Sequence, residues 1–395
     1  MRASTRRRCT SASGFAWARV LLVVRRFIVV AAAALALAPS AQGAVPTVNA
    51  RAFIVVDAST GDVLAQHDAD AHVPIASITK LMTVLIALEH TRPNDVVTVQ
   101  RAAAEVGEST INLRAGERIS VRELLAGALI QSANDAADAL ADYVAHGDER
   151  AFVAMMNAKA KQLGLAGTHF SRPDGLDAPH HYSTARDVTR LAQELMKRPV
   201  VRSLVRERTA VIEGGRTLHT WNDLLGVFRG LVGVKTGHTG AAGWCEVADV
   251  KRDGLDVYAT ILGSPTRGSR NADLAALLRW AFGVERTAWV IAPGRVYVRV
   301  PTAYGRAAVP LVASRSVLRP VRLDRPLVER VLAPAAADLP VRRGEQLGEV
   351  RVFSGRQLVA RAPLVAARSV SRPGFFGRLG FYGGRTFSHI GGWFS

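Results

Sequence analysis

Three short motifs place residues that can do chemistry beside apolar segments. The first pairs Ser77 with Lys80 in "PIASITKLMT", and the second pairs Ser132 with Asn134 in "QSANDAADALADYV". The third begins at Lys235 in "GVKTGHTGAAGWC". A serine hydroxyl is a weak nucleophile that needs an adjacent base, and a lysine can be that base when burial keeps it neutral. Together these side chains predict nucleophilic catalysis by a serine.

The first motif opens a predicted helix over residues 77–89, "SITKLMTVLIALE", which is apolar almost all round. Such a helix is expected to be buried, and an unpaired charge there is costly. Residues three apart on a helix are neighbours on one face, so Ser77 and Lys80 would meet. The alternative interpretation is a helix-capping serine and a surface lysine, because S-x-x-K occurs by chance in many proteins.

The second motif follows the apolar run "LLAGALI" and begins another predicted helix. Helix capping by Ser132 or Asn134 is again the alternative interpretation. If this motif is part of a catalytic site, Ser132 supplies a hydroxyl that can pass on a proton. Asn134 supplies an amide for a lysine and for a substrate carbonyl.

The third motif contains the consecutive residues Lys235, Thr236, Gly237, His238 and Thr239 on a predicted strand. Gly237 lacks a side chain, so a ligand backbone could approach the strand there. Lys235 and the two threonines offer a cation and two donors that suit a carboxylate. The alternative interpretation is an edge strand whose polar residues guard against aggregation.

The elements around these motifs predict an α+β fold. Strand patterns at residues 51–57 and 63–68 precede a block of helices, and further strands are expected at 231–236, 244–250 and 256–262 before a helix at 271–282. Helices are expected within the block at 101–109, 120–130, 134–145, 148–163 and 184–197. This order predicts one antiparallel sheet that is built from both ends of the domain, with a helical subdomain inserted between them.

The first 43 residues predict an export signal rather than part of the fold. They contain seven arginines and no acid, then the apolar run "FIVVAAAALALA" at 27–38 and small residues at Ala41 and Gly43. Twelve apolar residues are fewer than the roughly 20 that span a bilayer. An uncleaved anchor that starts at Val20 is the alternative. Cleavage would leave Cys245 as the sole thiol, so we expect no disulfide and no cysteine metal site.

After the domain at 44–285, the sequence consists of short segments of alternating apolar and polar residues separated by Pro and Gly. This pattern predicts a small all-β domain at 286–370. Residues 288–370 hold 14 basic and five acidic residues, so much of the net charge of +18 lies in the C-terminal third. The tail at 371–395 contains seven aromatics, seven glycines and three arginines without an acid. This distribution indicates an anionic membrane or wall surface as a partner, and not nucleic acid.

Read in order, S-x-x-K, S-x-N and K-T-G form the signature of class A β-lactamases and penicillin-binding proteins. The chain resembles the low-molecular-mass penicillin-binding proteins, the serine-type D-alanyl-D-alanine carboxypeptidases. The resemblance covers about residues 50–285, including "MNAKAKQLGLAGTHFSRPDGL" and "YSTARDV", and continues more weakly into the β domain. It implies a β-lactamase/transpeptidase-like sheet with an inserted helical subdomain.

The resemblance also implies roles for the motif residues. Ser77 is the expected nucleophile and Lys80 its base, while Ser132 and Lys235 relay a proton and Asn134 positions the peptide. The backbone N–H groups of Ser77 and His238 are the expected oxyanion hole.

Lys235, Thr236, Gly237, His238 and Thr239 are expected to bind substrate. The two threonines would hold its terminal carboxylate. Some relatives place an arginine where this chain has Trp221, so carboxylate recognition is expected to differ, with Arg270 as a candidate helper.

The expected substrates are peptidoglycan stem peptides, and β-lactam antibiotics are expected as covalent inhibitors. No cofactor is expected. The alternatives are a DD-endopeptidase on cross-linked peptides, a β-lactamase and an inactive wall scaffold. The β-lactamase activity needs a deacylating glutamate, and residues 135–230 offer no convincing one. We expect the protein to act on the outer side of the cytoplasmic membrane or in the cell wall.

Overall fold

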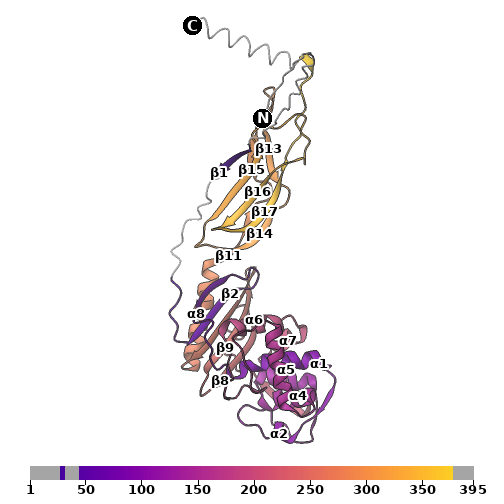
Figure 1. Cartoon of the computed structure of the whole chain (residues 1–395), viewed down its shortest axis with the longest axis vertical. Coiled ribbons are helices and arrows are strands. Elements are labelled where there is room, and N and C mark those ends of the chain that lie inside the picture. The colour runs from indigo at the N-terminus through magenta and orange to yellow at the C-terminus, as the bar shows by residue number, and fades with distance from the viewer. Residues whose placement is uncertain (1–26, 32–43, 377–395) are drawn as a thin grey trace, which may run out of the picture. The chain divides into compact units, whose positions relative to one another are not determined.

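The computed structural model describes residues 27–31 and 44–376 (Figure 1). Its described residues form two compact units. The larger unit contains residues 44–290 and 318–327. The second unit, here called the C-terminal β unit, contains residues 27–31, 291–317 and 328–376.

A five-stranded antiparallel sheet forms the centre of the larger unit. Its strands run in the order β3-β2-β10-β9-β8, so β2 pairs on one side with its neighbour in sequence, β3, and on the other with β10, about 200 residues later in the chain. Their bounds are β2 Ala52–Asp57, β3 Val63–His67, β8 Leu231–Thr239, β9 Gly243–Arg252 and β10 Leu255–Ser264. The expected sheet from both ends of the domain is therefore confirmed.

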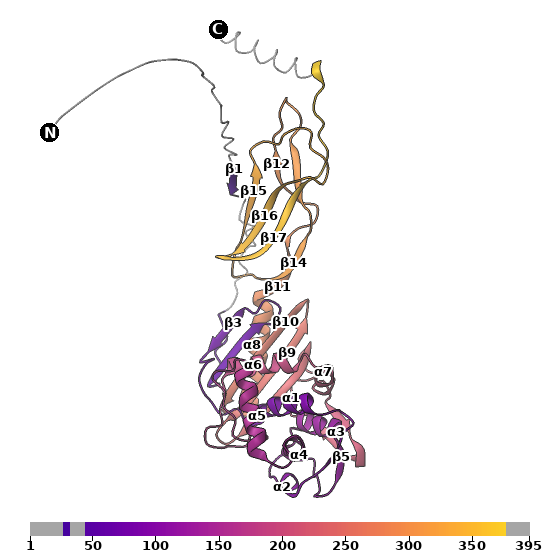
Figure 2. The ribbon, with the colours of Figure 1, turned by 45° about the vertical axis from the view of Figure 1, so that its right-hand side comes forward.

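Each face of this sheet is covered by a separate hydrophobic cluster. Along β2, Ile54 and Val56 belong to one cluster, whereas Phe53 and Val55 belong to the other, as the period-two alternation of a strand requires. Helix α8 (Arg267–Val284) covers the second cluster through Leu274 and its neighbours. The other helices lie on the opposite side, and Figures 1 and 2 show α8 and the helical group on either side of the sheet.

The helical group follows the expected periodicity, with one helix shorter than predicted. The structure ends α2 after a single turn, although the sequence predicted a helix to residue 109. The helices of the group are α1 Lys80–His90, α2 Arg101–Ala104, α3 Val121–Ala126, α4 Asn134–Ala145, α5 Glu149–Gln162, α6 Ala185–Leu195 and α7 Pro199–Leu204. Two small ladders accompany them, β4 Val96–Thr98 with β5 Arg118–Ser120, and β6 Thr209–Val211 with β7 Thr217–His219.

The C-terminal β unit is built on a six-stranded sheet in the order β1-β15-β16-β17-β13-β12. Its strands are β1 Phe27–Ala31, β12 Val296–Val300, β13 Val309–Ala313, β15 Leu327–Pro334, β16 Gln346–Ser354 and β17 Gln357–Ala366. A separate two-stranded ladder joins β11 (Glu285–Ile291) to β14 (Val317–Arg322), and all but one residue of each strand belongs to the larger unit. The predicted short alternating strands are thus present.

Most of the predicted signal segment and tail lie outside the described residues. The described part of the apolar run at 27–38 is β1, which pairs antiparallel with β15. None of the helices in the described ranges is long and apolar enough to span a bilayer.

Candidate active site

The first motif does not begin a regular α-helix at its serine. Ser77 lies in a one-turn 3-10 segment, η1 (Ala76–Thr79), and α1 begins at Lys80. The Ser77 hydroxyl caps neither segment. The helix behind it is buried from Lys80 to Ala87, as its apolar surface predicted. Helix capping, the alternative interpretation of this serine, is therefore wrong.

Lys80 is fully buried and directs its amine at the serine. Its Nζ donates to the Ser77 Oγ at 2.9 Å, to the Asn134 Oδ1 at 2.7 Å and to the Asp174 carbonyl oxygen at 2.6 Å. Burial lowers the pKa of Lys80 to about 8, against the opposing effect of the Asp174 carboxylate. Because this pKa is close to neutral pH, a useful fraction of the amine is unprotonated and can act as a base for the hydroxyl beside it.

The second motif lies at a break between two helices. A π-helical turn, η2 (Gly127–Gln131), ends at Ser132, which adopts a left-handed conformation with φ 65°. Helix α4 then begins at Asn134 without a side-chain cap. The Asn134 amide instead donates to the Gly107 carbonyl at 2.9 Å while its oxygen accepts from Lys80. Capping therefore fails to explain this motif as well.

The third motif meets the second through a lysine–serine hydrogen bond. Lys235 Nζ donates to the Ser132 Oγ at 2.8 Å and to the Thr236 carbonyl oxygen at 2.7 Å. Burial lowers the pKa of Lys235 well below its ordinary value, and the positive charge of Lys80 lowers it further. Two buried amines thus lie in one site, each directed at a serine hydroxyl.

Strand β8 lies at the edge of the sheet, so the edge position in the alternative interpretation of the third motif is confirmed. Its lysine and Thr236 are nevertheless buried, so they do not guard an exposed edge. A Cβ at Gly237 would lie 2.9 Å from the Ile75 carbonyl oxygen and 3.1 Å from the Ser77 nitrogen. The glycine therefore permits a close approach of the chain's own nucleophile segment, rather than of a ligand alone.

A cavity of about 180 Å³ connects the three motifs. Its lining includes all three expected elements together with a glutamate, two tryptophans and an arginine: Ser77, Glu108, Ser109, Ser132, Asn134, Trp221, Thr236, Gly237, His238, Trp244 and Arg270. Thr239 is not part of this lining. Its hydroxyl donates its single hydrogen to the Asp177 carboxylate at 2.6 Å, so it has none to donate to a substrate carboxylate.

Arg270 reaches the cavity from α8 although it is almost completely buried. Its Nε lies 3.2 Å from Glu246 Oε2, and its Nη2 donates to Asn271 Oδ1 at 2.6 Å. Burial raises the pKa of Glu246 to about 7, and the arginine opposes this effect. These contacts hold the guanidinium at the wall of the cavity.

Sequence reasoning missed the contributions of Asp174, Gly175 and Glu246. The Asp174 carboxylate binds Arg172 at 2.5 and 2.6 Å, which fixes the carbonyl that holds Lys80. Gly175 has φ 86°, and a Cβ there would lie within 2.2 Å of the Ala76 carbonyl oxygen. The segment "SRPDGL" carried this signal, since a glycine after an acid marks a tight turn.

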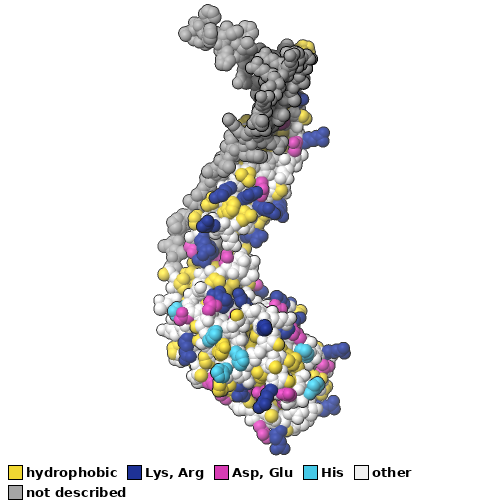
Figure 3. All heavy atoms as spheres, viewed as in Figure 1, with side chains coloured by type: hydrophobic (Ala, Val, Ile, Leu, Met, Phe, Trp, Pro, Cys, Tyr) yellow, Lys and Arg dark blue, Asp and Glu magenta, His cyan; other side chains and the backbone are white. Residues whose placement is uncertain are grey.

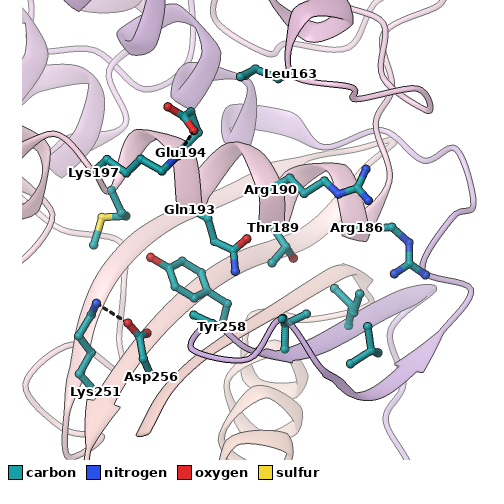
Figure 4. Close-up of a pocket in the computed structure, with 16 residues that line it drawn as sticks. Leu163, Arg186, Thr189, Arg190, Gln193, Glu194, Lys197, Lys251, Asp256 and Tyr258 are labelled. Atoms are coloured by element: carbon teal, nitrogen blue, oxygen red, sulfur yellow. Dashed lines mark hydrogen bonds and ion pairs between the residues drawn. The ribbon is translucent and has the colours of Figure 1, made fainter. Parts of the chain in front are cut away.

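A larger cavity, of about 600 Å³, lies between α6 and the sheet and contains none of the motif residues (Figure 4). Two of the cations that line it already have carboxylate partners. Lys197 contacts Glu194 at 2.5 Å, and Lys251 contacts Asp256 at 2.6 Å. Size alone therefore does not identify the reactive site, which is the smaller cavity beside the buried amines.

Comparisons with known proteins agree with this geometry. A family model described as D-alanyl-D-alanine carboxypeptidase matches residues 39–266, which is more than half of the chain. The chain belongs to the D-alanyl-D-alanine carboxypeptidase family. It is similar to the D-alanyl-D-alanine carboxypeptidase DacC of Escherichia coli, with 32% identity over 89% of this chain and 92% of that protein. It is also similar to the D-alanyl-D-alanine carboxypeptidase DacF of Bacillus subtilis, with 30% identity over 83% of this chain and 87% of that protein.

Solved structures of penicillin binding proteins show the same fold. Penicillin binding protein 6B from Escherichia coli has a TM-score of 0.63 at 28% identity, over 83% of this chain and 98% of that one. Penicillin binding protein 5 from Haemophilus influenzae has a TM-score of 0.63 at 25% identity, over 84% of this chain and 100% of that one. The predicted resemblance, the α+β fold and a serine carboxypeptidase of the D-Ala-D-Ala type are confirmed. The β-lactamase, endopeptidase and scaffold alternatives are not favoured.

Proposed function

We propose that this carboxypeptidase acts through an acyl-enzyme on Ser77. The Ser77 Oγ attacks the carbonyl carbon between the last two D-alanines of a stem peptide, and its proton passes to Lys80. The C–O ester bond forms as the C–N bond breaks, and the terminal D-alanine leaves as an amine. The observation that carries this assignment is the 2.9 Å contact between a fully buried lysine and the serine.

Ser132 and Lys235 supply the proton that the leaving D-alanine needs. Their 2.8 Å hydrogen bond forms a short relay from the buried amine to the hydroxyl that lines the cavity. Asn134 holds Lys80 in place by accepting a hydrogen bond through its side-chain oxygen. A water molecule then hydrolyses the ester and releases the shortened peptide with Ser77 restored.

Charge that develops on the carbonyl oxygen is stabilised by the N–H groups of Ser77 and His238. This proposal is supported by the close passage of β8 beside the nucleophile, since the Cβ position of Gly237 lies 3.1 Å from the Ser77 nitrogen. The terminal carboxylate of the substrate pairs with Arg270 and Thr236. We retain Thr239 only as a support of the strand end, because its hydroxyl is engaged by Asp177.

Two measurements test the assignment. Purified protein should release D-alanine from a peptide that ends in two D-alanines, and cleavage of cross-linked dimers without this release would favour an endopeptidase. Intact-mass spectrometry should detect a penicillin adduct on the wild type but none on Ser77→Ala. The matched control Ser203→Ala removes an exposed hydroxyl on α7 and should keep the adduct. An adduct on Ser77→Ala would overturn the nucleophile assignment.

The family match supports peptidoglycan stem peptides as substrates and β-lactams as covalent inhibitors. We further propose that the arginine-rich segment at 1–43 directs export, so that the enzyme meets these peptides outside the cytoplasmic membrane. The basic surface of the C-terminal β unit, part of which Figure 3 shows, supports contact with an anionic membrane or wall polymer. The aromatic tail at 371–395 would add to that contact.

A further inference from the structure

Trp221 forms part of the wall of the catalytic cavity. It follows β7 on the loop before β8, and its side chain lines the same cavity as the nucleophile and His238. The residue is 44% exposed, which leaves much of the indole open to a substrate. An aromatic surface in a small cavity favours apolar groups of matching size.

The indole is held in place by elements that are far apart in the sequence. Its Nε1 donates to the Gln131 carbonyl at 3.0 Å, and the same carbonyl accepts from the Ser109 hydroxyl at 2.9 Å. The Arg267 guanidinium lies over the ring, 5.2 Å from its centre. Asp223 binds that guanidinium through two hydrogen bonds, at 2.5 and 2.7 Å. The ring is therefore a fixed wall rather than a mobile surface side chain.

Trp221 also stands near the cation assigned to the substrate carboxylate. Arg270 lies one turn of α8 after Arg267, and its Nη2 is 3.3 Å from the same Asp223 carboxylate that holds Arg267 on the indole. Trp244 lies close to both arginines, at 5.9 Å from Arg267 and 5.7 Å from Arg270. A residue whose carboxylate pairs with Arg270 would therefore lie in the cavity that both indoles line.

We propose that Trp221 restricts the leaving residue to a small, uncharged side chain such as the methyl group of D-alanine. This inference rests on the proposed function, because it places the leaving residue beside Arg270. The cavity is small, about 180 Å³, and its wall is fixed by the contacts described above. A longer side chain has to displace the indole and break its bond to Gln131, and a charged side chain loses its hydration against the ring.

The test compares kcat/KM for three peptides that differ only in the last residue, D-alanine, D-leucine or D-lysine. Wild-type protein should strongly prefer D-alanine. Trp221→Ala should raise the D-leucine to D-alanine ratio by about tenfold, the size of effect that one or two methylene groups have in an apolar pocket. Trp221→Phe keeps a ring but loses the hydrogen bond to Gln131, so its D-leucine to D-alanine ratio should lie between those of the wild type and Trp221→Ala.

The matched control is Trp289→Ala, which removes an exposed tryptophan on β11 and should leave the ratio as in the wild type. A thermal unfolding curve for each variant separates selectivity from stability. If wild-type protein releases no D-alanine, the proposed function fails. If it releases D-alanine but Trp221→Ala keeps the wild-type ratio, or if the wild type accepts D-leucine equally well, the inference about Trp221 alone is overturned.

Discussion

A methyl group at Gly237 should disable the active site while leaving the fold largely intact. The Cβ of an alanine there would lie 2.9 Å from the Ile75 carbonyl oxygen, 3.1 Å from the Ala76 Cβ and 3.1 Å from the Ser77 nitrogen. Ordinary contacts of this kind begin at about 3.4 Å, so either β8 or the nucleophile segment has to move by roughly half an ångström. The neighbours that must move are mostly backbone, which cannot turn away as a side chain can.

This displacement acts on the proposed oxyanion hole. Loss of one such donor costs about 100- to 1,000-fold in rate, and overpacking a well-filled site costs about 1–3 kcal/mol in stability. We therefore expect Gly237→Ala to slow acylation by roughly 100-fold while the protein remains folded at 25 °C. Stopped-flow measurement with a fluorescent penicillin gives the acylation rate, and circular dichroism gives the unfolding midpoint.

Gly240→Ala is the matched control, because a Cβ at Gly240 meets no atom within 4 Å. This variant should acylate within about twofold of the wild type, since a methyl group in open space costs little. The reasoning is refuted if Gly237→Ala acylates within about threefold of the wild type. An inactive Gly237→Ala that is already unfolded at 25 °C would also contradict it, because the expected loss is local.

Three of the remaining predictions concern single residues, and one concerns the tail. If Lys80 is the base, acylation should rise about tenfold from pH 7 to pH 9 and then level off, since its pKa is about 8 and the neutral amine is the reactive form; a continued rise through pH 10 would indicate an unshifted lysine. Ser132→Ala should lower kcat/KM for the peptide by roughly 100-fold or more with an unchanged unfolding midpoint, and a wild-type value would remove Ser132 from the proton path. Phe152→Ala should lower the free energy of unfolding by about 3–5 kcal/mol in urea titrations, because its side chain is completely buried in the helical group. Deletion of residues 371–395 should leave turnover of a soluble peptide unchanged and weaken binding to anionic liposomes, and equal binding by both forms would exclude the tail as an anchor.

Much of the larger unit could be predicted from local pattern. The apolar surface of the segment after Ser77 predicted a buried helix, and the β-branched, apolar segment at 51–57 predicted a strand; both are present. The prediction over residues 101–109 was too long, because apolar periodicity does not show where tertiary contacts stop supporting a helix. The position of β8 at the edge of the sheet also depends on pairings between distant segments, which a single sequence does not reveal.

By itself the sequence determined the chemical types and their order: a serine with a lysine three residues later, a second serine near an asparagine, and a lysine–threonine–glycine strand. It did not determine which atoms meet. Lys80 donates its third hydrogen bond to a carbonyl oxygen 94 residues away, and Lys235 donates to a hydroxyl 103 residues away. Only the packed structure removes water from both amines, and this desolvation is what lowers their pKa values and turns two lysines into candidate proton carriers.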